Sequence, residues 1–348
     1  MSSVLDVAKT VGFPALIRMR RVKREVWEEL ISPHFVTRSI QTLLNVGFLD
    51  ALRQGPLDPA EFARDHALNE RLLLALSEAL YARRVLTRKG SRFGLDEKGK
   101  LIVQSSLGRG WFDLVFGYEA MLHGMEDMLR NKTSYGGRNV RDGRFVGVGS
   151  GLASVDFYFP LVRRLIAGGG CRRVLDIGCG DGMFLRYLCA SLPGVEGVGL
   201  DLSPEAVAAG NQSIRQEGLG DRIRLHVGDA NCIGDFRNEL KGVDAATTFF
   251  VLHELCDNKD NARVKRFLSA YRDTLAGVPF HIVESVRPPA RELRKRPGPA
   301  VEYFLFHDLS GQTPIARDAW KALFRSAHFS SVKEDFLGFV RTSIYTLR

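Results

Sequence analysis

The sequence predicts an α/β fold that follows a helical first segment, and three observations support this expectation. In the second half of the chain, short apolar runs rich in β-branched residues alternate with segments of helical periodicity, which is typical of a parallel sheet covered by helices. A glycine-rich turn separates the first such run, Arg173 to Ile177, from the next helix. The first half shows helical periodicity and one short hairpin. At 348 residues the chain is long enough for two domains that each bury a core.

Composition excludes several classes of protein. Hydrophobic residues make up 45% of the chain and charged residues 26%, as in globular rather than disordered chains. No run approaches the roughly 18 to 20 apolar residues that a membrane helix needs, and the start lacks the pattern of a secretory signal. The five cysteines have no CxxC or zinc-like spacing. We therefore expect a cytoplasmic protein with reduced thiols and no membrane partner.

The glycine-rich turn carries the most specific motif. Gly178, Gly180 and Gly182 follow Asp176 at alternate positions, and glycine there lets the backbone turn sharply and lets a ligand approach closely. A dinucleotide fingerprint would place its third glycine three residues after the second. The G-x-G-x-G spacing after an acid resembles motif I of the class I S-adenosylmethionine-dependent methyltransferases. The resemblance implies that Asp176 lies near the methionine amino group and that the glycines line the cofactor.

Two further acids stand where the next strands end. Val198 to Asp201 is the second expected strand, and a carboxylate at its end can accept hydrogen bonds from both ribose hydroxyls. Ile223 to Val227 is the third, and the resemblance implies that Asp229 after it binds the adenine amino group. We therefore expect S-adenosylmethionine as cofactor, with this set of binding residues: Asp176, Gly178, Gly180, Gly182, Asp201, Leu202, Asp229 and Ala230.

Four more segments complete the predicted sheet. The very apolar runs Val243 to Val251 and Phe280 to Ser285 are typical of buried parallel strands. Ser331 to Phe336 and Thr342 to Leu347 can pair antiparallel across a short turn. Together with the resemblance, this pattern predicts a Rossmann-like methyltransferase sheet of seven strands, six of them parallel.

The pattern of helices and a hairpin over residues 1–110 predicts a winged-helix domain. Helical periodicity over Pro33 to Leu52, a capped helix start at Asp58 and a Leu-rich helix from Glu70 to Arg83 precede a hairpin over Val85 to Leu95. Winged helices often bind DNA, and this hairpin is basic. In the O-methyltransferase-like enzymes that the chain resembles, the module instead serves as a dimerisation and substrate-lid domain. We therefore expect a homodimer and no nucleic-acid partner.

Over residues 111–169 we expect helices that connect the two domains and line the substrate pocket. Their large apolar side chains suit core packing, dimer packing or a pocket wall. The net charge of +9 lies mostly in the first half of the chain; it fits a solvated helix face or a site for an anionic substrate. Gly168 to Gly170 then marks the hinge to the catalytic domain, residues 170–348.

The chemistry is expected at the carboxyl end of the fourth strand, where open α/β sheets bind ligands. His253 follows that strand, and in the plant-type O-methyltransferases a histidine at this position takes the proton from a phenolic hydroxyl. A neutral imidazole suits a general base near pH 7. Glu284, which closes the fifth strand, matches an acid that brackets the family's base. Its alternative role is that of a buried carboxylate holding His253.

The chain departs from the plant enzymes at the second bracketing acid, where Thr313 replaces a glutamate. In its place the chain offers His253, Glu254 and His307. Two imidazoles and one carboxylate can hold a divalent or ferric ion and leave positions open for substrate. A group of natural-product C-methyltransferases that act on 2-oxo acids looks similar here. The sequence leaves metal-dependent and metal-free chemistry equally open.

The sequence thus predicts an S-adenosylmethionine-dependent methyltransferase of specialised metabolism, with C-methylation of the β-carbon of a 2-oxo acid favoured. His253 and Glu284 are its expected catalytic residues, and an arginine of the loop 138–144 is a candidate partner for the substrate carboxylate. One alternative is O-methylation of a hydroxylated aromatic with His253 as general base. A more remote one is a winged-helix regulator that binds the cofactor without catalysis.

Overall fold

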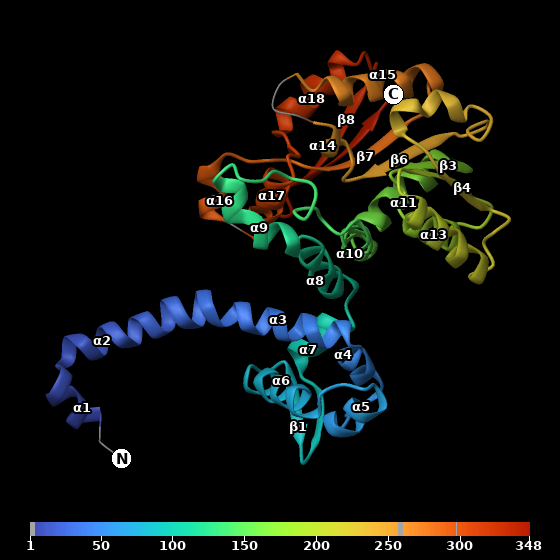
Figure 1. Ribbon diagram of the computed structural model, residues 1–348. Coiled ribbons are helices and arrows are strands. Elements are labelled where there is room, and N and C mark those ends of the chain that lie inside the picture. Colours follow the sequence, from blue (N-terminus) through green and yellow to red (C-terminus); the bar gives the residue numbers. More distant parts are fainter. Residues whose placement is uncertain (1–3, 257–259, 297) are drawn as a thin grey trace. The chain divides into compact units, whose positions relative to one another are not determined.

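The computed structural model describes residues 4–256, 260–296 and 298–348 (Figure 1). The chain divides into two compact units, Met1–Phe112 and Asp113–Arg348, and each is considered by itself. Within the described ranges no single helix is long and apolar enough to span a membrane. The helices α10 (Gly143–Val155) and α11 (Tyr158–Gly169) reach that length and hydropathy only as a pair, with a bend of 66° between them.

The first unit has the winged-helix arrangement that the sequence predicts. Its elements are α1 (Val4–Val11), α2 (Phe13–Val22), the π-helix η1 (Lys23–Ile31), α3 (Ser32–Asn45), α4 (Phe48–Ala51), η2 (Leu52–Gln54), α5 (Pro59–Asp65), α6 (Glu70–Ala82), β1 (Leu86–Lys89), β2 (Arg92–Leu95) and α7 (Glu97–Val103). The antiparallel hairpin β1–β2 pairs Leu86 with Leu95. Asp58 caps α5 as expected, because its carboxylate accepts a hydrogen bond from the Ala60 N–H at 2.9 Å.

One predicted helix is interrupted. The expected helix from Pro33 to Leu52 ends at Asn45, and Gly47 then adopts a φ of +77°. A left-handed glycine is a common helix end. The chain therefore changes direction at Gly47, and Phe48 and Leu49 of the next short helix are fully buried in the core of this unit.

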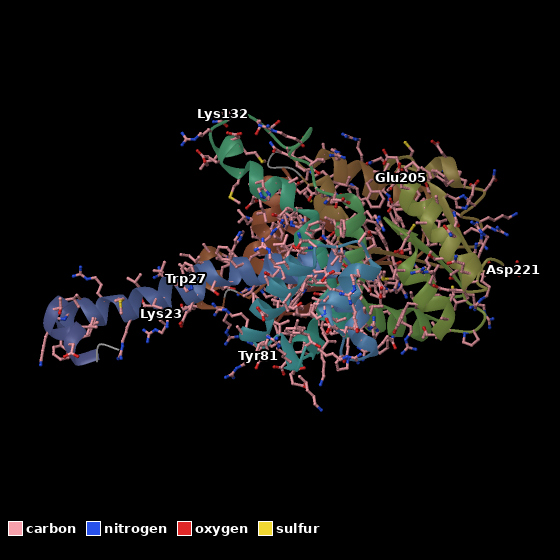
Figure 2. The ribbon with its side chains drawn as sticks, turned by 60° about the horizontal axis from the view of Figure 1, so that its bottom comes forward. Lys23, Trp27, Tyr81, Lys132, Glu205 and Asp221 are labelled. Carbon is pink, nitrogen blue, oxygen red and sulfur yellow. The ribbon has the colours of Figure 1, made fainter. Side chains whose placement is uncertain are left out.

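The N-terminal helices of the first unit leave large apolar side chains uncovered. Phe13, Ile17 and Phe35 are exposed, and Leu30 is 70% exposed. On η1 the side chains of Lys23 and Trp27 extend outward from the helix (Figure 2). Exposed apolar surface of this kind is unusual on soluble monomeric proteins.

One sheet of seven strands organises the second unit, in the order β5-β4-β3-β6-β7-β9-β8. The strands are β3 (Arg173–Ile177), β4 (Glu196–Asp201), β5 (Ile223–Val227), β6 (Ala245–Phe249), β7 (Phe280–Ser285), β8 (Val332–Leu337) and β9 (Thr342–Leu347). Strands β3 to β7 are mutually parallel, β9 is antiparallel to β7, and β8 is antiparallel to β9. β8 therefore runs with β3 to β7, which confirms a seven-stranded sheet with six parallel strands.

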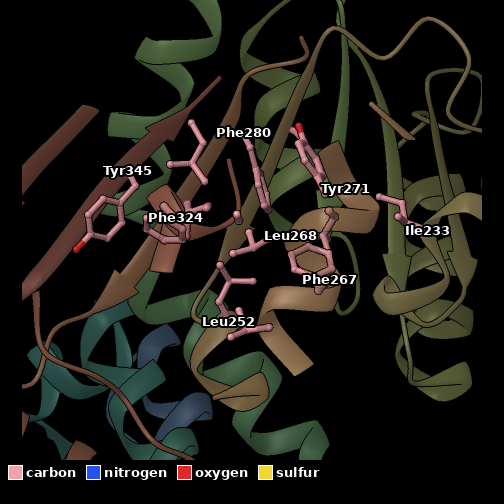
Figure 3. Packing of buried hydrophobic residues seen from close by; sticks show 14 of the residues in the cluster. Ile233, Leu252, Phe267, Leu268, Tyr271, Phe280, Phe324 and Tyr345 are labelled. Carbon is pink, nitrogen blue, oxygen red and sulfur yellow. The ribbon is translucent and has the colours of Figure 1, made fainter. Parts of the chain in front are cut away.

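Helices cover both faces of this sheet (Figure 1). Besides α10 and α11 they are α12 (Met183–Ser191), α13 (Pro204–Gln216), η3 (Ala230–Phe236), α14 (Leu252–Leu255), α15 (Ala262–Thr274) and α18 (Arg317–Ser326). The other helices are α8 (Ser106–Gly117), which crosses the boundary between the units, α9 (Glu119–Leu129), α16 (Ala290–Lys295) and α17 (Ala300–Leu309). On one face Tyr271 of α15 stacks on Phe280 at 4.3 Å between ring centroids, and Phe324 of α18 contacts Tyr345 at 5.0 Å (Figure 3). Because helices cover both faces, the central strands β3, β6 and β7 are buried along almost their whole length.

Close packing between α13 and the glycine-rich turn gives a test of this arrangement. A Cβ on Gly210 of α13 would lie 2.4 Å from the Asp181 carbonyl oxygen and 2.6 Å from the Leu225 side chain. We predict that Gly210→Ala lowers the free energy of unfolding by about 1–3 kcal/mol, although alanine favours a helix by about 1 kcal/mol. The measurement is urea-induced unfolding.

The matched control is Gly147→Ala in α10, because a Cβ at Gly147 meets nothing within 4 Å. This change is expected to leave stability unchanged or to raise it slightly. A Gly210→Ala protein that is as stable as the Gly147→Ala protein would contradict the close seating of α13 on the turn.

Candidate active site

The glycine-rich turn connects β3 to α12 in a conformation that favours glycine. Gly178, Gly180 and Gly182 have φ values of +71°, +55° and +74°, a region that other residues enter only with strain. At Gly178 there is also no space, because a Cβ would lie 2.4 Å from a methyl group of Val251. The turn therefore holds β3, α12 and the segment after β6 close together.

Asp176 is buried at the carboxyl end of β3. Its Oδ1 accepts a hydrogen bond from the Thr247 hydroxyl at 2.8 Å. Burial raises the pKa of Asp176 to about 7, the Thr247 hydrogen bond opposes the rise, and the charge of Asp201 adds to it. A buried acid of this kind is stabilised in its charged form by a cation placed next to it, such as an ammonium group.

Asp201 ends β4 with its carboxylate already oriented. Its Oδ2 accepts a hydrogen bond from the Gly180 N–H at 2.8 Å, and its Oδ1 accepts one from the Ser203 N–H at 2.9 Å. Each carboxylate oxygen has further lone-pair capacity, so both can still accept from a ligand such as a diol. The neighbouring Leu202 is 69% exposed, which leaves an apolar surface beside the carboxylate.

Asp229 follows β5 and caps η3, which begins at Ala230. Its Oδ1 accepts hydrogen bonds from the Asn231 N–H at 2.8 Å and the Asn231 side-chain amide at 2.9 Å. These bonds lower the pKa of Asp229. Because β5, β4 and β3 are adjacent in the sheet, the structure brings the expected cofactor residues to one edge, at or just after the carboxyl ends of three neighbouring strands.

A fully buried carboxylate holds His253 after β6. Oε2 of Glu284, at the end of the adjacent strand β7, lies 2.8 Å from His253 Nδ1. Oε1 accepts hydrogen bonds from the N–H groups of Leu252 at 2.6 Å and of His253 at 3.3 Å. A carboxylate partner places the proton on Nδ1, so Nε2 is left as the basic nitrogen. The structure thus brings together the two predicted catalytic residues.

The turn that presents His253 contains a strained residue that no sequence pattern predicts. Phe250, directly after β6, has a φ of +57°, a conformation that costs a non-glycine residue roughly 1–3 kcal/mol. Its N–H donates to the Val283 carbonyl oxygen at 2.8 Å. Aromatic residues carry no sequence signal for a left-handed backbone, and strain of this kind is concentrated at functional sites.

His307 of α17 lies beside His253. The two ring centroids are 4.5 Å apart, and His307 Nδ1 is 2.6 Å from the Tyr303 carbonyl oxygen. Burial and the neighbouring His253 lower the pKa of His307 to about 2, so its imidazole is neutral. The Tyr303 ring packs on His307 at 4.1 Å. Burial also raises the pKa of Tyr303 well above its ordinary value, an effect that the Glu284 charge increases and the nearby Ser285 hydroxyl only partly opposes.

Arg141, from the loop before α10, pairs with the third predicted metal ligand. An Nη of Arg141 lies 2.8 Å from the Glu254 carboxylate, and the other donates to Gln312 Oε1 at 3.3 Å. Burial is the largest influence on the pKa of Arg141 and would lower it, but the charges and hydrogen bonds of Glu254 and Tyr118 together raise the pKa. The sequence indicated only that an arginine of this loop was a candidate. The distance along the chain between Arg141 and Glu254 gave no signal for the pair.

The predicted metal set is therefore not assembled in this structure. His253 and His307 are adjacent, and each has its Nδ1 fixed by an oxygen acceptor, as metal-binding imidazoles do. Glu254, however, is engaged by Arg141. Among the residues that the structure describes, no group of three His, Cys, Asp or Glu side chains could hold a metal ion. The physical reason is the ion pair, which directs the carboxylate to the guanidinium.

Comparisons with known proteins agree with this geometry. Residues 175–309 match the family model described as a methyltransferase domain. The chain is 28% identical over 303 residues to the 2-ketoarginine methyltransferase of Streptomyces arginensis, covering 84% of each protein. It is 22% identical over 310 residues to the methyltransferase ungE' of Aspergillus campestris, covering 86% of this chain and 89% of that protein.

A solved structure shares the fold over almost the whole chain. Human N-acetylserotonin methyltransferase in complex with S-adenosylmethionine aligns with a TM-score of 0.71 at 17% identity, covering 93% of this chain and 97% of that one. The sheet order, the glycine-rich turn and the matched domain lead to one conclusion. Residues 175–309 form a methyltransferase domain on a seven-stranded sheet, the chain has the fold of a solved methyltransferase, and its first unit has a winged-helix arrangement.

Proposed function

We propose that the protein transfers the methyl group of S-adenosylmethionine to the β-carbon of a small 2-oxo acid in specialised metabolism. The observation that carries this proposal is the pairing of a buried base with a partly buried cation. His253, held by Glu284, can remove a proton, and Arg141, held next to it by Glu254, can bind a carboxylate. The relative from Streptomyces arginensis, which this chain matches over 84% of its length, is a 2-ketoarginine methyltransferase by name, and 2-ketoarginine is a 2-oxo acid.

The cofactor would lie along the sheet edge built by β3, β4 and β5. Asp201, with both oxygens oriented by backbone N–H groups, would accept hydrogen bonds from the ribose hydroxyls. Asp176 would face the ammonium group of the methionine part, and Asp229 would bind the adenine amino group. The glycines Gly178, Gly180 and Gly182 would let the cofactor approach the backbone, with Leu202 and Ala230 beside the nucleoside.

In the proposed reaction, Nε2 of His253 takes a proton from the β-carbon of the oxo acid. The C–H electron pair forms the C=C bond of an enolate, whose β-carbon attacks the sulfonium methyl group. A C–C bond forms, the C–S bond breaks, and its electron pair stays on sulfur as S-adenosylhomocysteine. Glu284 stabilises the imidazolium that results. Because the sulfonium is already a good leaving group, the protein mainly supplies alignment and the carbon nucleophile.

Arg141 would orient the substrate through its carboxylate. A guanidinium binds a carboxylate with two parallel hydrogen bonds, which fixes direction as well as charge. In this structure the Arg141 partners are Glu254 and Gln312. A substrate carboxylate would share or replace them. Because His253 and His307 are also buried, substrate entry requires neighbouring side chains to move.

A divalent or ferric ion remains a further proposal. His253, Glu254 and His307 would be its ligands, and the ion would polarise the 2-oxo group as a Lewis acid. The ion pair between Arg141 and Glu254 does not fit that ligand set as it stands. The steps above therefore use only groups of the protein itself.

A second candidate reaction is O-methylation of a hydroxylated aromatic. The same His253–Glu284 pair favours it, because an imidazole held by a carboxylate can equally take a proton from a phenol. The replacement of the family's second acid by Thr313 removes one support for this reaction. The third candidate, a winged-helix regulator without catalysis, leaves the buried His253–Glu284 pair without a role.

The exposed apolar side chains of the first unit support the proposal that the protein forms a homodimer. They lie on α2, η1 and α3, and include Phe13, Ile17, Leu30 and Phe35. The same helices of a second copy would cover them, because a two-fold symmetric interface buries the same surface patch on both subunits.

The cofactor site is tested by Asp201→Ala. Losing hydrogen bonds to a charged acceptor, each worth roughly 1.5–3 kcal/mol, should weaken S-adenosylmethionine binding by about 10- to 100-fold. Isothermal titration calorimetry measures the affinity. Asp221→Ala is the control, because Asp221 is exposed and lies in the same domain. Equal affinity in the two variants would count against the assigned site.

The base is tested by His253→Gln. Loss of a general base should lower kcat by about 100-fold or more, while calorimetry should show an unchanged affinity for the cofactor. His123→Gln, in which an exposed histidine of α9 is replaced, should keep full turnover. If His253→Gln also keeps full turnover, His253 does not remove the proton. If even the wild-type protein shows no turnover but binds duplex DNA with a steep salt dependence, the hypothesis of a winged-helix regulator without catalysis is supported instead.

A further inference from the structure

The hydroxyl group of Tyr303 is an anomaly at the centre of the candidate site. Tyr303 lies on α17, and its ring centroid is 4.1 Å from that of His307 and 6.1 Å from that of His253. The hydroxyl oxygen is buried, and although the Ser285 hydroxyl lies near it, its contacts with the described residues do not meet hydrogen-bond geometry. A buried polar group without a partner costs roughly 1–3 kcal/mol. Such a group in a native structure needs an explanation, and beside His253 and His307 a bound substrate can supply the missing partner.

The hydrogen-bond capacity of the neighbouring side chains shows what is missing. Nδ1 of His253 is bonded to Glu284, and Nδ1 of His307 is bonded to the Tyr303 carbonyl oxygen. Oxygen acceptors at both Nδ1 atoms hold a proton there, so a ring that acts as a base presents its Nε2 as an acceptor. Neither ring can then donate a hydrogen bond to a substrate oxygen. Of these three side chains, Tyr303 is the one that can.

The proposed reaction requires a donor at this place. When a proton leaves the β-carbon of a 2-oxo acid, negative charge builds up on the 2-oxo oxygen. A donor fixed beforehand in a site without water stabilises that charge as it forms. Arg141 is already assigned to the carboxylate, so another group must serve the 2-oxo oxygen.

We propose that the Tyr303 hydroxyl is a further catalytic group, which donates a hydrogen bond to the 2-oxo oxygen of the substrate as it becomes an enolate oxygen. The inference rests on the proposed function and adds a residue to it. The proton of Tyr303 stays on its own oxygen throughout. The proton that leaves carbon goes to Nε2 of His253, and the electron pair of the broken C–H bond ends in the new C–C bond to the methyl group. The unsatisfied hydroxyl of the free enzyme thus finds its partner in the reacting substrate.

The test is Tyr303→Phe, which removes only the hydroxyl oxygen. We expect kcat to fall by about 100-fold or more, as on loss of one oxyanion donor, with little change in KM because the bond strengthens only as charge develops. The melting temperature should be unchanged or higher, since no hydrogen bond of the folded protein is lost. A second readout is hydrogen–deuterium exchange at the substrate β-carbon in D2O, followed by proton NMR with S-adenosylhomocysteine bound. The probes are 4-methyl-2-oxopentanoate and 5-guanidino-2-oxopentanoate.

Tyr345→Phe is the matched control. The Tyr345 hydroxyl on β9 is also buried without a hydrogen bond, but its ring packs on Phe324 in the core. This variant should keep wild-type kcat, exchange rate and cofactor affinity. A Tyr303→Phe enzyme that matches it in kcat and in β-carbon exchange would overturn the inference. So would a Tyr303→Phe protein that loses thermal stability and cofactor binding along with activity, because the role would then be structural.

The outcomes separate this inference from the function on which it rests. If the wild-type protein neither exchanges the β-proton nor methylates any 2-oxo acid, the proposed function fails and the role of Tyr303 fails with it. If the wild-type protein does both and Tyr303→Phe does both equally fast, the function stands and only the role of Tyr303 is refuted.

Discussion

The candidate site depends on one buried carboxylate. Glu284 has no exposed surface, and its two oxygens take hydrogen bonds from the His253 ring and from the backbone of Leu252 and His253. A buried carboxylate that loses such partners costs several kcal/mol. The end of β7 is therefore tied to the start of α14. This tie fixes the direction of the imidazole, the tautomer that it adopts, and the turn at Phe250 that leads into it.

The sheet order is what makes that tie possible. β6 and β7 are neighbours, so the segment after one strand meets the last residues of the other. β3 and β4 lie next to β6 on its other side, which brings the cofactor residues to the same edge of the sheet. The predicted cofactor residues and His253 are thus brought to one edge of the sheet by strand order, whereas Arg141, His307 and Tyr303 come from segments outside the sheet.

The strands and the turn that carry the expected cofactor residues could be predicted from the sequence because their signals are local. Asp176 and the three glycines lie within seven residues, and Asp201 and Asp229 each follow a recognisable apolar strand. The parallel sheet and the hairpin of the first unit were predictable for the same reason. The prediction of one continuous helix over residues 33–52 was wrong. The spacing of the apolar residues continues past Gly47, but the left-handed backbone of Gly47 ends the helix there.

The substrate half could be predicted only in part, because its contacts are remote in sequence. The Arg141–Glu254 pair joins residues 113 positions apart, and no periodicity or spacing in the sequence predicts it. The same pair explains why the expected ligand set of His253, Glu254 and His307 is not assembled. Tyr303 has an ordinary place in an apolar helix, and its unsatisfied hydroxyl is visible only after α17 has been packed against His253.

The most direct test of the central claim is to locate the transferred methyl group. The protein is incubated with S-adenosylmethionine carrying a 13C-labelled methyl group and with a panel of 2-oxo acids, their methyl esters and phenols, each with and without a chelator, and the products are identified by NMR. We predict a labelled methyl group on the β-carbon of a 2-oxo acid and no reaction of its ester, because Arg141 needs a carboxylate. Loss of turnover with chelator and its return with added metal would support the ligand set of His253, Glu254 and His307. A labelled methyl group found only on a phenol oxygen would contradict the account.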